Sequence, residues 1–81
     1  MARREWGPAV ARAYIMRALL LKSLDSFAEV HHFAHLRPHP LKGPRAGQWA
    51  LALHGRWRLI VTPVSDVNAV IIQEVSNHYG D

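Results

Sequence analysis

The sequence HPLKGPRAGQW, residues 39–49, separates two parts of the chain that follow different hydrophobic patterns. Its two prolines fix φ and remove backbone donors, so the segment cannot be helical. Its two glycines permit positive φ. His39, Lys42 and Arg45 lie among these residues, and the segment ends by entering a predicted strand. A stiff basic loop that leads into a sheet is suited to binding phosphate.

Two helices are predicted before this loop. Pro8 suits the first position of a helix, and apolar residues recur at spacings of three and four from there to Ser23. This helix is predicted to pack on a core, with a membrane-surface helix as the alternative. Ser26 and Glu29 form a Ser-x-x-Glu capping-box pattern, which predicts a second, shorter helix that runs through about residue 36.

A β-hairpin is predicted directly after the loop. Residues 48–53 alternate in hydrophobicity, which places Trp49 and the next two leucines on one buried face. A His-Gly turn signal follows, and residues 56–62 form the returning strand. Trp57 falls on that strand, so the two tryptophans are predicted to pair across the hairpin in the core. Stacking on nucleic-acid bases is the alternative.

The last part of the chain predicts a third strand. Pro63 indicates that the second strand ends or lies at an edge there. Residues 69–75 are apolar on both faces, which favours a central strand. The predicted fold class is therefore α+β, a helical hairpin packed on a small antiparallel sheet, with residues 1–81 as a single domain.

Composition excludes several classes of protein. The chain contains no cysteine, which rules out disulfides and thiolate metal sites and is compatible with a reducing cytoplasm. The longest apolar run is too short to span a bilayer, so no membrane partner is expected. Arg12 and Arg17 interrupt any signal-peptide core near the start of the chain.

The charges are unevenly distributed along the chain. The net charge is +4, and no acidic residue lies between Val30 and Ser65. That interval contains five of the lysines and arginines, which are Arg37, Lys42, Arg45, Arg56 and Arg58. An uncompensated basic segment attracts polyanions. A solvated basic surface without a ligand is the alternative interpretation.

The histidines of the second predicted helix raise the question of a metal site. His31 and His35 are four residues apart and would share a helix face, a spacing that can bind zinc. No third ligand is evident from the sequence. We therefore expect no metal, and interpret these histidines as exposed or N-capping residues.

The loop and the hairpin together resemble the HigB-type toxins of the RelE/ParE superfamily, which belong to bacterial toxin–antitoxin pairs. The resemblance covers residues 12–80. It is carried by HPLKG at residue 39, RAGQW at residue 45, WRLI at residue 57, and Glu74-Val75 close to a terminal histidine. It implies a RelE-like fold and a ribosome-dependent endoribonuclease that cleaves messenger RNA without a metal or other cofactor.

The resemblance also implies which residues form the site. His39 and Lys42 match the histidine and lysine of the family's loop, and Arg58 matches the arginine of its second strand. At the C-terminus, His78 falls opposite the family's aromatic residue and Tyr79 opposite its histidine, and His78 is the preferred catalytic candidate. Residues expected to bind RNA lie nearby in the sequence and are Arg37, Arg45, Gln48 and Arg56.

These residue types suit metal-free cleavage of RNA. The 2′-OH must lose its proton, the charge on the phosphorane must be neutralised, and the leaving 5′-oxygen must gain a proton. The guanidinium of Arg58 can grip two phosphate oxygens, and Lys42 can reach over the phosphate from the loop. His39 and His78 are candidate acid and base. A surface role without chemistry is the alternative for each of the four.

Partners follow from the same resemblance. It implies messenger RNA, the ribosome and a cognate antitoxin, commonly a helix-turn-helix protein of the HigA type, all in the cytoplasm. The family's first β-strand has no counterpart here, so we expect an exposed sheet edge that favours a homodimer, antitoxin pairing or aggregation. Two alternatives remain open: a gyrase-directed toxin of the ParE type, and a reduced, inactive protein that binds RNA or an antitoxin.

Overall fold

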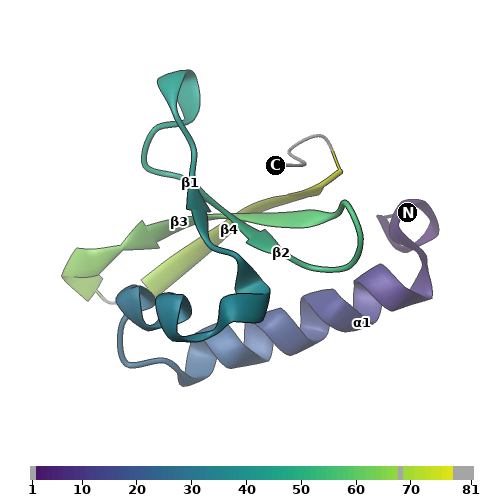
Figure 1. Ribbon diagram of the computed structural model, residues 1–81, viewed down its shortest axis with the longest axis horizontal. Helices are drawn as coiled ribbons and strands as arrows, with labels where there is room; N and C mark the ends of the chain where they lie inside the picture. Colours follow the sequence, from purple (N-terminus) through teal and green to yellow (C-terminus); the bar gives the residue numbers. More distant parts are fainter. Residues whose placement is uncertain (1, 68, 78–81) are drawn as a thin grey trace.

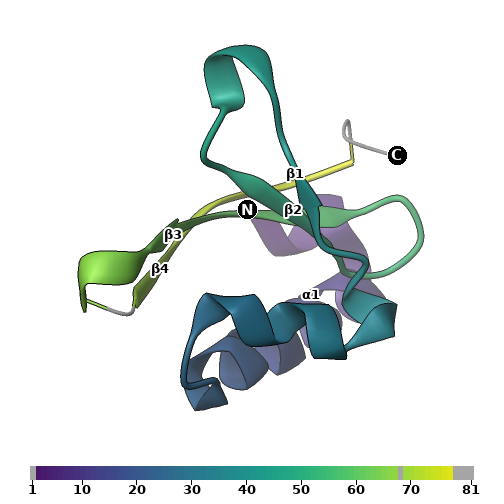
Figure 2. The ribbon, with the colours of Figure 1, turned by 60° about the vertical axis from the view of Figure 1, so that its left-hand side comes forward.

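The fold is that of a computed structural model, which describes residues 2–67 and 69–77. One long helix, α1 (Ala2–Ser23), lies along one face of a four-stranded antiparallel sheet (Figure 1). Two 3-10 helices, η1 and η2, follow it and cover the same face (Figure 2). The elements after α1 are η1 (Phe27–His32), η2 (Ala34–Leu36), β1 (His39–Pro40), η3 (Gly43–Arg45), β2 (Trp49–Ala52), β3 (Arg58–Val64), η4 (Ser65–Val67) and β4 (Ala69–Ser76). The predicted α+β fold class is confirmed.

Helix α1 is interrupted near its start and is tied to the sheet in its middle. Gly7 has φ 81° and ψ 165°, values that leave the helical region, and Pro8 begins the regular part of the helix. Val10 from this part is 2% exposed and belongs to the core. The Arg17 side chain donates from Nε to the backbone oxygen of Ala52 at 3.1 Å, which joins the helix to strand β2.

The prediction of a second α-helix is wrong, because η1 and η2 replace it. Phe33, with φ −114° and ψ 89°, separates the two. The apolar residues here recur every three positions, at Phe27, Val30, Phe33 and Leu36. A period of three matches the 3.0 residues per turn of a 3-10 helix, whereas an α-helix would turn Val30 and Leu36 to different sides. Val30 and Leu36 are both completely buried.

The predicted capping box forms only in part. Ser26 has the extended backbone of an N-cap residue, but its side chain makes no capping hydrogen bond. The Glu29 carboxylate instead accepts a hydrogen bond from the backbone nitrogen of Asp25 at 3.2 Å. The chain direction at the start of η1 is therefore set by Glu29 rather than by the serine hydroxyl.

The sheet is a meander in which each strand pairs with its neighbours in sequence, in the order β1-β2-β3-β4. Strand β1 was not predicted, and it extends the sheet beyond β2 by pairing His39 with Ala50. The prediction that the last strand is central is wrong, because β4 forms an edge. Pro63 lies in β3 beyond the last residue paired with β2, so β3 has a neighbour on one side only there, as the proline indicated.

The turn between β2 and β3 is longer than the predicted two residues. The backbone nitrogen of Trp57 donates to the oxygen of His54 at 3.0 Å, and Gly55 has φ 58°. Trp57 therefore belongs to the turn, and the predicted cross-strand pair of tryptophans is wrong because Trp49 lies opposite Val61. The ring of Trp49 packs edge-on against Phe27 of η1 instead, with 5.5 Å between centroids.

The core lies between α1 and the sheet. The predicted buried face of the hairpin is confirmed, since Leu51 and Leu53 from β2 and the following turn pack with Leu59 and Val61 from β3. We call this the helix face of the sheet. The opposite side, which we call the outer face, carries two cross-strand rows, because directly paired residues share a face. The rows are His39–Ala50–Ile60–Glu74 and Ala52–Arg58–Ser76.

Candidate nucleic-acid interface

The loop of residues 41–48 extends the β1–β2 hairpin away from the helical layer (Figures 1 and 2). The prediction that this segment contains no helix is wrong, because η3 forms one short 3-10 turn in which Pro44 takes an early position that needs no backbone donor. The backbone nitrogen of Leu41 donates to the oxygen of Gln48 at 2.9 Å and so closes the base of the loop. Gly43 and Gly47 have φ values of 63° and 95°, conformations that other residues rarely adopt. The loop is thus built by its glycines and held in shape by backbone hydrogen bonds.

Arg45 and Gln48, both expected to bind RNA, contact each other. Arg45 donates from Nε to Oε1 of Gln48 at 2.8 Å. Its Nη2 lies 3.5 Å from Oε1 of Glu74 on β4. The side chains of Arg45 and Glu74 are 30% and 42% exposed, so solvent screens this ion pair. Glu74 therefore compensates part of the loop's positive charge and connects the loop to the sheet edge.

Arg58 is held at the turn between β2 and β3. Its Nη1 donates to the backbone oxygens of Gly55 at 2.9 Å and Trp57 at 3.0 Å. On the outer face it lies between two small residues, Ala52 and Ser76. These hydrogen bonds orient the guanidinium, which is part-buried. An oriented guanidinium on a central strand is a suitable ligand for a phosphate group.

His39 shares the outer face with Arg58, in the neighbouring row. Two strand spacings and two residues along the strand separate them, which gives about 12 Å between their Cα atoms. Between them the floor of the face is apolar and closed, since Ala50 is 4% and Ile60 0% exposed. His39 itself is exposed. The two residues therefore flank a buried floor and do not contact each other across it.

The other predicted site residues lie at separate places on the surface. Lys42 is exposed at the start of η3, on the loop. Arg56 is exposed in the turn next to Arg58. Arg37 is exposed between η2 and β1 and has a left-handed backbone, with φ 48°. His78 and Tyr79 lie outside the described residues.

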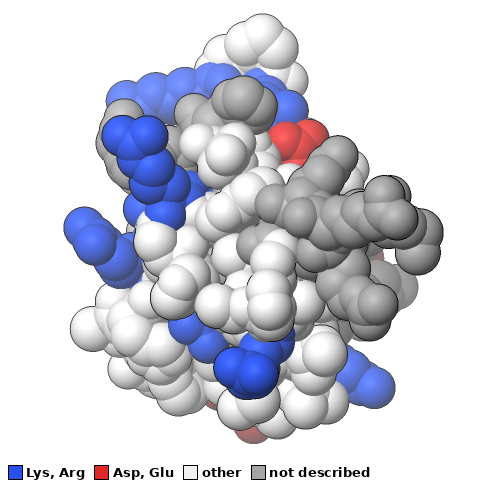
Figure 3. Space-filling view, turned by 90° about the vertical axis from the view of Figure 1, so that its right-hand side faces the viewer, with Lys and Arg blue, Asp and Glu red and all other residues white. Residues whose placement is uncertain are grey.

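Cationic side chains gather at the end of the molecule from which the 41–48 loop rises. In Figure 3 the blue surfaces of lysine and arginine collect at the upper end, with a red carboxylate surface beside them. Lys42 and Arg45 of the acid-free interval lie on the loop itself, whereas Arg37 follows η2, and Arg56 and Arg58 lie at the turn between β2 and β3. A cationic surface raises the local concentration of polyanions through long-range attraction.

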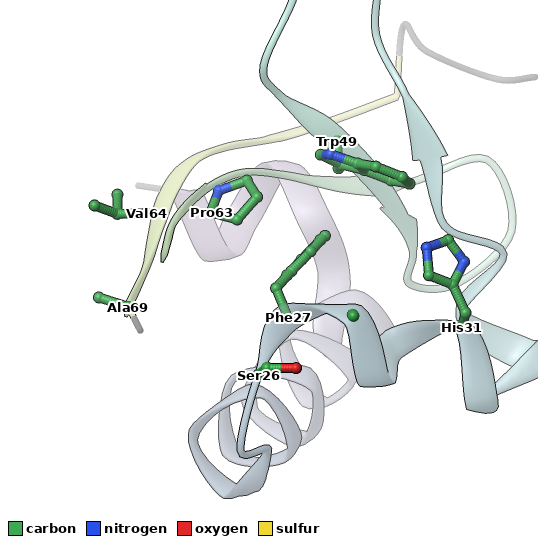
Figure 4. A pocket seen from close by; sticks show the side chains of 8 residues that line it. Ser26, Phe27, His31, Trp49, Pro63, Val64 and Ala69 are labelled. Carbon is green, nitrogen blue, oxygen red and sulfur yellow. The ribbon is translucent and has the colours of Figure 1, made fainter. Parts of the chain in front are cut away.

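The structure also has a cleft that was not predicted from the sequence. A cleft of about 420 Å³ opens on the helix face, between η1 and the end of the β3–β4 hairpin (Figure 4). Trp49, Phe27 and His31 face one another there, with 5.4 Å between the His31 and Trp49 ring centroids. Its lining residues are Ser26, Phe27, Ala28, His31, Trp49, Pro63, Val64 and Ala69. The period of three in η1, which turns Phe27 toward the sheet, is the sequence signal for this cleft.

The shared helix face that a second α-helix would give His31 and His35 does not form. The two histidines lie in different 3-10 helices, and each packs against an aromatic ring, Trp49 for His31 and Phe33 for His35. Over the described part of the chain, no three histidine or acidic side chains are grouped so as to hold a metal ion. Within the same residues, no helix has the length and apolar character needed to cross a membrane.

No protein-family model, curated protein or solved structure matches this chain.

Proposed function

We propose that this chain is a toxin of the RelE/ParE superfamily, of the HigB type, which cleaves translated messenger RNA on the ribosome in the cytoplasm. The observation that carries the proposal is the outer face of the sheet. There, strand register puts His39 and the oriented guanidinium of Arg58 on one surface, beside a cationic loop. The proposal includes a cognate helix-turn-helix antitoxin of the HigA type that neutralises the activity.

The cleavage chemistry assigns one task to each group. A base removes the proton of the 2′-OH, whose oxygen attacks the adjacent phosphorus, and the bond to the 5′-oxygen breaks with transfer of a proton to that oxygen. The products are a 2′,3′-cyclic phosphate and a 5′-hydroxyl. His39 is the proposed proton-transfer group on the sheet, and His78, in preference to Tyr79, is the proposed second one. No metal takes part in this scheme.

Arg58 and Lys42 neutralise the charge that develops on the phosphorane. The two hydrogen bonds to Gly55 and Trp57 hold the Arg58 guanidinium in one orientation before RNA binds. A preorganised cation costs no reorganisation during the reaction, and one such donor is worth about 10²–10³-fold in rate. Lys42, which is exposed on the loop, is the proposed second cation for this phosphate. Arg37, Arg45, Gln48 and Arg56 bind the flanking phosphates and sugars.

The test is induction of the chain in bacteria, with growth and messenger RNA cleavage measured together. We expect wild type to arrest growth and to cut translated messages, and Arg58→Ala to lower cleavage by at least 100-fold, which is the loss of one fixed donor. Arg58→Lys is expected to restore only a small part, because an ammonium lacks the planar fork. Arg12→Ala on the exposed side of α1 is the matched control and leaves the activity unchanged.

Circular dichroism of the purified variants shows whether Arg58→Ala still folds. Equal toxicity of wild type and folded Arg58→Ala would contradict the proposal. Growth arrest with DNA damage and intact messages would support the gyrase-directed alternative. RNA binding without cleavage by wild type on translating ribosomes would support the inactive binding protein.

A further inference from the structure

Strand β4 has the composition of a central strand and the position of an edge strand. On one side it pairs with β3 at every residue except Gln73, where the register shifts, and on the other side no described residue pairs with it. Eight residues at about 3.3 Å each leave an open edge roughly 26 Å long. Edge strands of soluble proteins are normally short, charged or covered, because unpaired backbone groups recruit other strands.

The open edge carries apolar side chains on both faces. Ile71, on the outer face, is 51% exposed, and Ile72, on the helix face, is 37% exposed. The only charged residue of β4 is Glu74, and Arg45 of the same chain already neutralises it. The edge is thus long and apolar, and it presents no unbalanced charge to a second strand.

The apolar surface continues from this edge onto α1. A groove of about 420 Å³ runs between them and is lined by Ala18, Leu21, Lys22, Leu24, Ala69, Val70 and Ile72. Ile15 and Leu19 share a helix face with Ala18 and Lys22, since these positions are spaced by three, four and seven residues. Ile15 is 56% and Leu19 57% exposed, so they border the groove with more apolar surface.

We propose that a second copy of this chain covers the edge, through antiparallel pairing of the two β4 strands around a two-fold axis at Ile71. In this register Ile71 lies opposite Ile71 of the second copy, and Val70 lies opposite its Ile72. Directly paired residues share a face, and Val70 and Ile72 do lie on the same face, so the register is consistent with the pleat. The result is one continuous eight-stranded sheet.

The charge of the edge and the area of the patch both favour a second copy of the chain. Two identical edges meet without opposing charges, because Glu74 is paired within each chain. Pairing also buries part of the groove lining, since Ile72 of each copy lies beside Val70 of the other on the helix face. With the axis at Ile71, residues 69–73 of the two strands pair over about 16 Å, and the groove and the α1 surface beside them enlarge the contact toward the about 800 Å² per partner that a stable dimer needs.

The test uses sedimentation of the purified chain over a concentration series. We expect a reversible dimer whose dissociation constant rises at least tenfold in Ile71→Lys, because two like charges then face each other at the axis. Met16→Lys is the matched control: Met16 is 57% exposed on α1 and does not line the groove, and it is expected to change the constant less than twofold.

Disulfide trapping tests the register itself. The chain has no cysteine, so a single Ile71→Cys variant reports only on its own position. Residues directly opposite in an antiparallel pair have Cα atoms about 4.5–5.5 Å apart, within the range of a disulfide. We expect mild oxidation to convert Ile71→Cys to a covalent dimer and Met16→Cys to remain monomeric.

Three results would overturn the proposal. The first is a monomer at all concentrations up to several hundred micromolar, which would leave the edge for a strand of a different polypeptide. The second is a dimer that forms equally well in Ile71→Lys and Met16→Lys. The third is equal rates of trapping by the two cysteine variants. None of these outcomes depends on ribonuclease activity, so they are independent of the proposed function.

Discussion

At the scale of single residues, Arg45 is the side chain whose surroundings most affect the proposed interface. Its Nε is bound to Gln48, and its Nη2 to Glu74, so the cation is held against the sheet rather than extended from the loop. Glu74 is also the register partner of Ile60, which forms part of the buried floor. A polyanion that binds this face therefore meets one carboxylate among the cations.

Glu74→Gln is expected to strengthen binding of single-stranded RNA about two- to fivefold near 0.1 M salt, because the carboxylate that neutralises Arg45 is removed. The slope of log K against log salt should steepen by about 0.7, the value for one further phosphate on a single strand. The free energy of unfolding should fall by less than about 1 kcal/mol, since the ion pair is solvent-screened. Fluorescence anisotropy of a labelled oligonucleotide over a salt series measures both binding quantities.

Asp66→Asn is the matched control for this variant. It removes one negative charge from an exposed position in η4, and thus changes the net charge equally without touching Arg45. If both variants strengthened RNA binding to the same extent, the effect would come from net charge, and the role assigned to the Arg45–Glu74 pair would be wrong.

At the scale of elements, the turn between β2 and β3 connects backbone geometry to the proposed site. Gly55 has φ 58°, and a Cβ added there would meet no atom within 4 Å. Its backbone oxygen accepts one of the two hydrogen bonds from Arg58. The conformation of this one residue therefore affects both the stability of the hairpin and the orientation of the guanidinium.

Gly55→Ala should lower the free energy of unfolding by about 1–2 kcal/mol, because an L-residue is strained in the left-handed region even where there is space. Gly55→Asn should cost clearly less, since asparagine tolerates this conformation. Urea denaturation followed by tryptophan fluorescence measures both. Equal losses in the two variants would indicate that side-chain contacts, rather than the backbone, set the cost.

The elements that could be predicted from the sequence are those whose pattern reflects local geometry. The period of α1 and the alternation in β2 and β3 are such patterns. The buried face of the hairpin was confirmed, and α1 contributes Val10 to the core, whereas Met16 and Leu19 of its predicted apolar stripe are each 57% exposed. The prediction of a second α-helix is wrong because the capping signal marks only where a helix starts. The spacing of three in Phe27, Val30, Phe33 and Leu36 is what indicates a 3-10 helix. Strand β1 was missed because it has only two residues, one of them a proline.

Features that depend on the arrangement of strands could not be predicted. An apolar strand such as β4 is predicted to be central whether the neighbouring strand belongs to the same chain or to another. The contact of Arg45 with Glu74 depends on a register shift between Ile60 and Val61, which the sequence does not indicate. The residue types of the candidate site, and their place in the acid-free segment between Val30 and Ser65, could be predicted from the sequence. That His39 and Arg58 share a face follows only from the strand register.

At the scale of the whole molecule, the stability of the fold depends on a small set of buried apolar side chains. Within the described residues, the completely buried side chains come from η1, η2 and the two middle strands; the largest are Leu36, Leu51, Leu59, Ile60, Val30 and Val61. A chain of 81 residues is expected to have roughly 4–12 kcal/mol of stability in total. A loss in this core is therefore a large fraction of that total.

Leu59→Ala should lower the free energy of unfolding by about 2–5 kcal/mol, because it leaves a cavity at the centre of the sheet. Met16→Ala, at a position that is 57% exposed, should cost less than about 1 kcal/mol. Thermal unfolding followed by circular dichroism and by tryptophan fluorescence compares them at one protein concentration, so that association does not alter the result. A comparable loss in both variants would show that the stability does not come from this core.

The order of the strands also bears on how fast the chain reaches its native state. Every strand of the sheet pairs with its neighbours in sequence, so each pairing closes only a short loop and costs little chain entropy. Packing of α1 on the sheet closes longer loops, since Val10 lies in one core cluster with Leu59 and Val61 and Arg17 binds Ala52, 35 residues away. The local strand pairings are therefore expected to form before α1 packs on the sheet. The meander thus pairs every strand with its sequence neighbour but leaves open the apolar β4 edge that we propose a second copy covers.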